Sequence, residues 1–132
     1  MSIFRCFLIA GAAIALVGCS QQTGPSVSRR YLIFFQQWSA QLDDSAKSTI
    51  SAAANLAKNH KAEPITVVGY ADPEGSPQAN RDISRLRAQI IVDGLVAEGV
   101  APDRIARRAA GSVDFSADSI ESRRVEIDVG TP

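Results

Sequence analysis

The chain has 132 residues, 45% of them apolar, and its 14 basic and 14 acidic side chains give no net charge. This length and composition predict one modest folded domain and exclude a disordered chain. The zero balance also argues against a nucleic-acid partner, because phosphate binding needs a basic surplus or a basic stripe, and the pairs Arg107–Arg108 and Arg123–Arg124 are too few to make one.

The first eighteen residues are typical of a processing segment. Arg5 precedes an apolar run, Phe7–Val17, that is too short to span a membrane. The run ends in Leu-Val-Gly directly before Cys19, which resembles a bacterial lipoprotein signal. That resemblance implies removal of residues 1–18, lipidation of Cys19 and, since Ser20 follows in place of an aspartate, sorting to the outer membrane.

Loss of the signal also removes Cys6, and the lipid uses Cys19, so the mature chain keeps no thiol for a disulfide or a metal site. We therefore expect no metal and no cofactor. Residues 19–29, rich in Ser, Gln and Gly, predict a flexible tether, and residues 30–130 the folded domain.

The first predicted element of the domain is a strand, Tyr31–Phe35, whose β-branched and aromatic residues suggest burial on both faces. A helix is expected next over Asp43–Asn59, with Asp43 or Asp44 as its N-cap. Its apolar residues recur at intervals of three and four: Ala46, Ile50, Ala53, Ala54 and Ala57.

A second strand is predicted at Ile65–Val68. After a Gly/Pro loop, Ser76 and Pro77 have the pattern of an N-cap and a first helical position, and this second helix is expected to run to about Glu98 and stop at Gly99.

Two further strands follow. Arg104–Ala110 is a weak candidate because of its arginines, whereas Arg124–Val129 alternates clearly. The order β-α-β-α-β-β predicts an α/β two-layer sandwich, with a mixed, at least partly parallel sheet and both helices on one face.

The second helix carries a polar stripe on its inward face. Asn80 and Arg87 are seven residues apart with Ser84 between them, and the preceding loop brings Asp72 to the same corner. Asp72 and Arg87 can simply pair with each other, as structural charges usually do. Alternatively they bind a zwitterion, Asp72 taking the ammonium and the guanidinium fork of Arg87 the carboxylate.

The loop and helix resemble the signature of the OmpA-like C-terminal domain, a peptidoglycan-binding module of outer-membrane proteins and lipoproteins. That signature is a Gly-x-x-Asp-x-x-Gly loop followed by Asn-x-x-(Leu/Ile)-Ser-x-x-Arg-Ala. The matching positions are Gly69, Asp72, Gly75, Asn80, Ile83, Ser84, Arg87 and Ala88. Similar flanking segments extend the resemblance to about residues 30–129.

The resemblance implies that Asp72 and Arg87 hold the diaminopimelate of the peptidoglycan stem peptide. It also implies that Arg123 or Arg124 lines the site, and that Asn80 orders the loop or touches the ligand. Two departures from the family pattern stand out. Gln36-Gln37 replaces an aspartate after the first strand, and the segment Ala109–Ser122 lacks the usual Gly-x-Gly-Glu turn.

An enzyme is not expected. His60 is the only histidine and follows the first helix, where a solvated or capping role is typical, and no serine has a histidine or lysine partner at a telling spacing. The sequence thus predicts an outer-membrane lipoprotein that binds peptidoglycan without cleaving it and faces the periplasm. The alternative is an envelope-assembly scaffold that uses the same fold for contacts with other envelope proteins.

Overall fold

The computed structural model describes residues 26–113 and 119–131. Its elements follow the predicted order, with a short 3-10 turn before the third strand and a single helical turn before the fourth. They are β1 (Arg29–Phe34), α1 (Asp44–Asn59), β2 (Ile65–Ala71), α2 (Pro77–Ala97), η1 (Pro102–Arg104), β3 (Ile105–Ser112), α3 (Ser119–Ser122) and β4 (Arg124–Val129). The predicted signal, Cys19 and most of the tether lie outside the described residues.

The strands form one mixed sheet in the order β1-β4-β2-β3. β2 and β3, joined through α2, are parallel, whereas β4 lies between β1 and β2 and is antiparallel to both. This confirms the predicted mixed sheet. It also puts β1 and β3 at the two edges.

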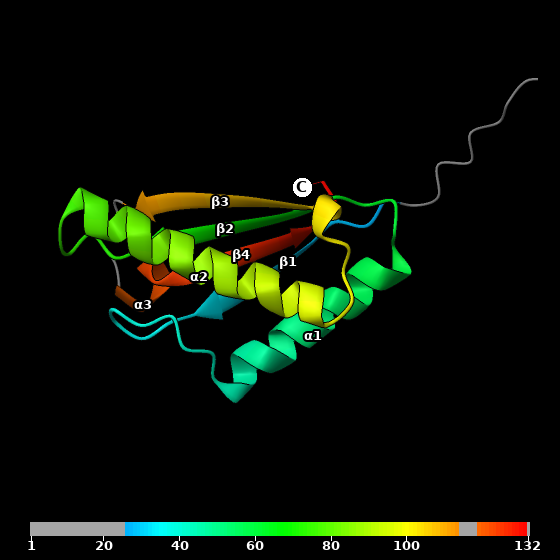
Figure 1. Ribbon diagram of the computed structural model, residues 1–132, viewed down its shortest axis with the longest axis horizontal. Helices are drawn as coiled ribbons and strands as arrows, with labels where there is room; N and C mark the ends of the chain where they lie inside the picture. Colours follow the sequence, from blue (N-terminus) through cyan, green and yellow to red (C-terminus); the bar gives the residue numbers. More distant parts are fainter. Residues whose placement is uncertain (1–25, 114–118, 132) are drawn as a thin grey trace, which may run out of the picture.

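Both long helices lie on the same side of the sheet, as Figure 1 shows. The core fills the space between these two layers. Its sheet-side members alternate along the strands, as expected for a face covered by helices, and the helices contribute mainly alanine, isoleucine and leucine. The buried core residues are Ile33, Phe35, Ala46, Ile50, Ala53, Ala54, Ala57, Ile65, Val67, Ala88, Ile91, Leu95, Val100, Val125, Ile127 and Val129. The predicted two-layer α/β sandwich is confirmed.

The prediction that the first strand is buried on both faces is wrong. Ile33 points into the core, but Leu32 and Phe34 are each 44% exposed on the opposite face. The reason is strand order: β1 is an edge strand, and neither long helix covers the face on which Leu32 and Phe34 lie. The apolar residues of a short segment do not indicate whether its strand lies at the edge of a sheet or which face the helices cover.

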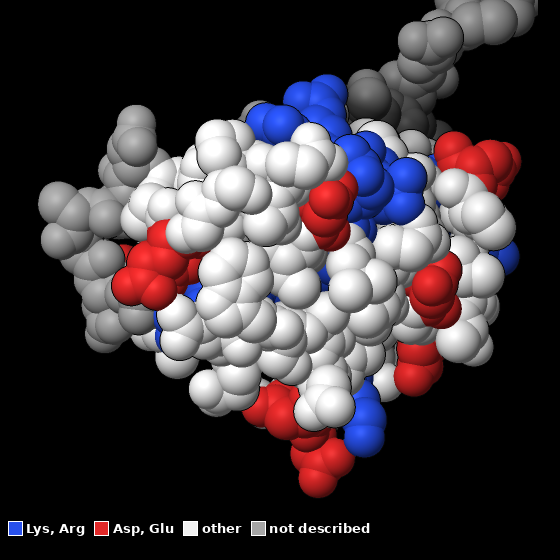
Figure 2. Space-filling view, turned by 60° about the vertical axis from the view of Figure 1, so that its left-hand side comes forward, with Lys and Arg blue, Asp and Glu red and all other residues white. Residues whose placement is uncertain are grey.

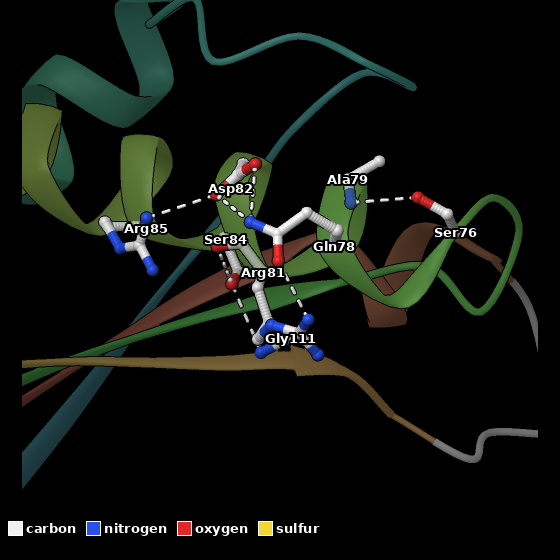
Figure 3. Close-up of polar contacts among 8 residues, drawn as sticks. All are labelled: Ser76, Gln78, Ala79, Arg81, Asp82, Ser84, Arg85 and Gly111. Atoms are coloured by element: carbon white, nitrogen blue, oxygen red, sulfur yellow. Dashed lines mark hydrogen bonds and ion pairs between the residues drawn. The ribbon is translucent and has the colours of Figure 1, made fainter.

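The helix ends are as predicted. Asp43 accepts a hydrogen bond from the Ala46 N–H at 2.7 Å and caps α1. Ser76 accepts from the Ala79 N–H at 3.1 Å, directly before Pro77 (Figure 3). Because these caps fix where each helix begins, they also fix which side of α2 meets the sheet.

The start of α2 is held very close to β2 and β3. A Cβ atom on Gly69 would lie 2.1 Å from the Ser84 carbonyl oxygen, so only glycine fits at this position of β2. The Ser84 hydroxyl accepts from the Gly111 N–H at 3.1 Å and donates to the Arg81 carbonyl at 2.9 Å (Figure 3). This contact positions the polar stripe of α2 against the end of the sheet.

Candidate ligand-binding site

A small pocket lies where two loops meet the first turns of α2. The β1–α1 loop forms one wall, the β2–α2 loop another, and α2 the floor. Its lining residues are Gln37, Trp38, Ala71, Asp72, Glu74, Asn80, Ile83, Arg87 and Arg123. The space left inside is about 10 Å³, room for roughly one water molecule.

Arg87 is buried at the base of this pocket, with 1% of its surface exposed. Its guanidinium donates to three backbone carbonyls, those of Ser39 (2.9 Å), Gln36 (3.0 Å) and Tyr70 (3.2 Å). It also lies over the ring of Phe35, 5.2 Å from the centroid. The inward position predicted for Arg87 is confirmed, and the backbone of both loops supplies its partners.

Burial lowers the pKa of Arg87 to about 10, with a further contribution from the positive charge of Arg123 and an opposing one from Asp72. At neutral pH the guanidinium therefore stays protonated. Two cations next to each other repel, so a carboxylate placed between them would be attracted to both.

Asp72 pairs with Arg123 and not with Arg87. The Arg123 Nη1 to Asp72 Oδ2 distance is 3.2 Å, and both side chains are nearly buried. The other Asp72 oxygen accepts from the Glu74 N–H at 2.9 Å, which holds the loop in a tight turn. The alternative in which Asp72 and Arg87 simply pair with each other is thus wrong, because Asp72 pairs with Arg123 and Arg87 donates to backbone carbonyls.

Asn80 is also buried, with 2% of its surface exposed, and it lines the pocket. Within the described residues its side-chain amide makes no hydrogen bond, whereas its backbone N–H donates to the Ser76 carbonyl at 3.0 Å. The amide is therefore available to water or to a ligand in the pocket.

The structure brings Asp72, Asn80, Arg87 and Arg123 together, but it does not bring Arg124 to this pocket. Arg124 lies on the opposite face of the sheet, where it stacks over Tyr70 at 4.1 Å and contacts Glu126 at 2.8 Å. Successive residues of an extended chain point to opposite faces, which separates the two neighbouring arginines.

Three features of the pocket were not predicted from the sequence. Trp38 covers one side, Ile83 contributes an apolar wall, and the Gln37 side chain donates to Glu74 at 2.8 Å. Gln37, noted as a departure from the family pattern, thus places a neutral amide at this corner. The other departure, Ala109–Ser122, forms the end of β3 and all of α3, and its residues 114–118 lie outside the described part.

The surface near the pocket carries no broad charged area. Figure 2 turns the end of the sheet where α2 begins toward the viewer. It shows Lys and Arg in small groups, some of them next to acidic side chains, on a mostly uncharged surface. In the described part of the chain no cluster of His, Cys, Asp and Glu is arranged to hold a metal ion. The polar side chains that line the pocket are two guanidinium groups, two carboxylates and two amides.

Comparison with known proteins identifies the family. The model of the OmpA family matches residues 34–126, well over half of the chain. This chain belongs to the OmpA family.

Individual relatives match over shorter regions. Outer membrane protein A of Serratia odorifera is 42% identical over 55 residues, which are 42% of this chain and 23% of that protein. The peptidoglycan-binding protein ArfA of Mycobacterium tuberculosis is 44% identical over 69 residues, 48% of this chain and 21% of that protein. The chain thus matches less than a quarter of the length of either relative.

Solved structures show the same fold. The peptidoglycan-associated lipoprotein from Burkholderia pseudomallei superimposes with a TM-score of 0.68 at 19% identity, covering 74% of this chain and 88% of that one. Within the described residues no helix has the length and apolar character needed to cross a bilayer.

Proposed function

We propose that this OmpA family domain binds peptidoglycan non-covalently by the free amino-acid end of the diaminopimelate in its stem peptide. One observation carries the proposal: a buried carboxylate, two guanidinium groups and the amide of Asn80 line the same small pocket. The similarity to ArfA, a peptidoglycan-binding protein, supports the same ligand.

The assignment of ligand groups follows from donor and acceptor counts. A guanidinium has five N–H donors, and Arg87 uses three on carbonyls, so 5 − 3 = 2 remain for a ligand carboxylate. Asp72 is acceptor-only and takes the ammonium. The amide of Asn80 is free to donate to the carboxylate or accept from the ammonium.

Arg123 has a double role in this proposal. In the free domain it neutralises Asp72, and its Nε also donates to the Phe35 carbonyl at 3.1 Å, which keeps the side chain in place. When the ligand ammonium reaches Asp72, Arg123 turns its charge toward the ligand carboxylate. The Asp72–Arg123 ion pair of the free domain is thereby replaced by four alternating charges: the Asp72 carboxylate, the ligand ammonium, the ligand carboxylate and the Arg123 guanidinium.

Anchoring at Cys19 completes the proposed function. A lipid on this cysteine would hold the domain at the outer membrane through the tether of residues 19–29, facing the periplasm. Two weak attachments, one to the membrane and one to the cell wall, reinforce each other because the first raises the effective concentration of the second. Palmitate labelling tests this anchor, with Cys19→Ala as the variant expected to remain unlabelled.

Binding without cleavage is part of the proposal. His60 is the C-cap residue of α1 and does not line the pocket. The pocket itself offers charges that hold a ligand, with no nucleophile paired to a base.

Co-sedimentation with purified sacculi tests the proposal. The 132-residue chain in mild detergent should pellet with the sacculi. Asp72→Asn should stay in the supernatant, because the amide keeps the shape but loses the charge that attracts the ammonium. Asp82→Asn, an exposed acid on the outer side of α2 next to Arg85 (Figure 3), is the matched control and should pellet like the wild type. Release of soluble muropeptides over time would instead indicate a hydrolase.

A scaffold function is the second candidate, and one observation favours it. Leu32 and Phe34 are exposed on the face of the sheet that lacks the long helices, and a hollow lined by these two residues, Glu121 and Arg124 lies beside them. If the wild-type chain remains in the supernatant with sacculi, contacts with envelope proteins become the better account of this fold.

A further inference from the structure

Trp38 has an unusual conformation for so large a residue. Its φ is +51°, in the left-handed region that bulky side chains rarely adopt. Its indole rests on Gly75 of the opposite loop, where an added Cβ would lie 2.5 Å from Cη2. The side chain thus reaches from the β1–α1 loop to the β2–α2 loop beside the pocket.

A second contact joins the same two loops. The Gln37 side chain donates to the Glu74 carboxylate at 2.8 Å, directly next to the contact between Trp38 and Gly75. Together these contacts leave about 10 Å³ in the pocket for the centre of a water-sized molecule, which is room for about one water. The head of an amino acid, with its ammonium, its carboxylate and the carbon between them, is larger than one water and does not fit in this space.

Trp38 lies in a turn formed by residues 36–39. The two ends of this turn are held by hydrogen bonds, whereas the Trp38 side chain is not. Arg87 holds the carbonyls of Gln36 and Ser39 at the two ends of the turn, and the Ser39 N–H donates to the Gln36 carbonyl at 3.1 Å. Trp38 is 53% exposed, and its indole N–H makes no hydrogen bond to the described part of the chain. The side chain can therefore move without breaking the contacts that position Arg87.

We propose that Trp38 is a movable cover of the binding pocket, held shut by Gly75 and assisted by the Gln37–Glu74 hydrogen bond. This inference rests on the proposed binding of the diaminopimelate end. The ligand binds only the open form, so its apparent affinity is reduced by the fraction of molecules that are open. Trp38 therefore affects the affinity for the ligand, although it is not one of the charged residues that bind it.

Trp38 is the single tryptophan of the chain, so its fluorescence reports the cover directly. Titration of the 132-residue wild-type chain with a diaminopimelate-containing stem peptide should give a saturable change in emission as the indole leaves Gly75. Calorimetry with the same peptide should show Trp38→Ala binding more tightly, on the order of three- to ten-fold, the equivalent of losing one or two weak closing contacts. Gln37→Ala should shift affinity in the same direction by a smaller factor.

Leu86→Ala is the matched control, because Leu86 is 49% exposed on α2 and does not line the pocket. Its affinity should equal that of the wild type. Weaker or unchanged binding by Trp38→Ala, with wild-type binding intact, would overturn the cover and leave the proposed function standing. If neither the wild type nor Trp38→Ala binds the peptide, both proposals fall. If only Trp38→Ala binds, the cover is supported in its strongest form.

Discussion

Replacing Arg87 by lysine should destabilise the domain strongly, although the charge is kept. The guanidinium donates to the carbonyls of Gln36, Ser39 and Tyr70 and lies over Phe35. A compact ammonium on a flexible stem cannot reach three carbonyls from two different loops. If two of them lose their partner, each at about 1–3 kcal/mol for a buried unsatisfied group, the free energy of unfolding falls by about 2–6 kcal/mol.

Urea unfolding followed by circular dichroism measures this loss. With a slope of about 1–3 kcal/mol/M for a small protein, the midpoint of Arg87→Lys should fall by about 1 M or more. Arg85→Lys, at an exposed position whose ion pair with Asp82 contributes about 0.3–0.5 kcal/mol, is the control and should be nearly unchanged. A midpoint for Arg87→Lys within the error of the control would refute the view that these carbonyl contacts stabilise the two loops.

Two further predictions each compare a variant with a control: one uses the neighbouring arginine and the other uses a second glycine. Arg123→Gln should weaken binding to sacculi by about ten-fold, a loss of about 1.4 kcal/mol, whereas Arg124→Gln on the opposite face should bind like the wild type; equal losses would contradict the assignment of Arg123 to the pocket. Gly69→Ala should lower stability in a thermal melt by about 1–3 kcal/mol or more, because its Cβ would meet the Ser84 carbonyl at 2.1 Å. Gly94→Ala, whose Cβ would meet only the Ile50 side chain, at 3.2 Å, should cost far less, and similar losses in both variants would argue against the close approach.

The elements of the fold were predictable because their signals are local. Asp43 and Ser76 lie at helix starts with the capping chemistry that the backbone requires, and Gly99, with φ of +93°, follows the end of α2. The exposure of β1 was not predictable from its own residues. It depends on which strand lies beside it and on which face the helices cover, and these are long-range properties.

The sequence indicated several of the residues that line the pocket, but not the partners that they contact. Helical periodicity put Asn80 and Arg87 on the inward face, and the preceding loop brought Asp72 to the same corner. The family resemblance added Arg123 or Arg124. Periodicity cannot show which carbonyls approach a guanidinium, so the three backbone partners of Arg87 and the pairing of Asp72 with Arg123 were missed. Trp38 was missed because a residue in a short turn has no periodic pattern to indicate which surface it covers.

The central claim is that the pocket recognises an ammonium and a carboxylate on the same carbon, and a comparison of two stem peptides tests it most directly. One peptide contains diaminopimelate; the other contains lysine, whose side chain ends in an ammonium without the carboxylate. Calorimetry on the 132-residue chain should show the diaminopimelate peptide binding at least about ten-fold more tightly, a difference of about 1.4 kcal/mol, and Asp72→Asn should bind neither. Equal affinity for the two peptides, or unchanged binding by Asp72→Asn, would contradict the account.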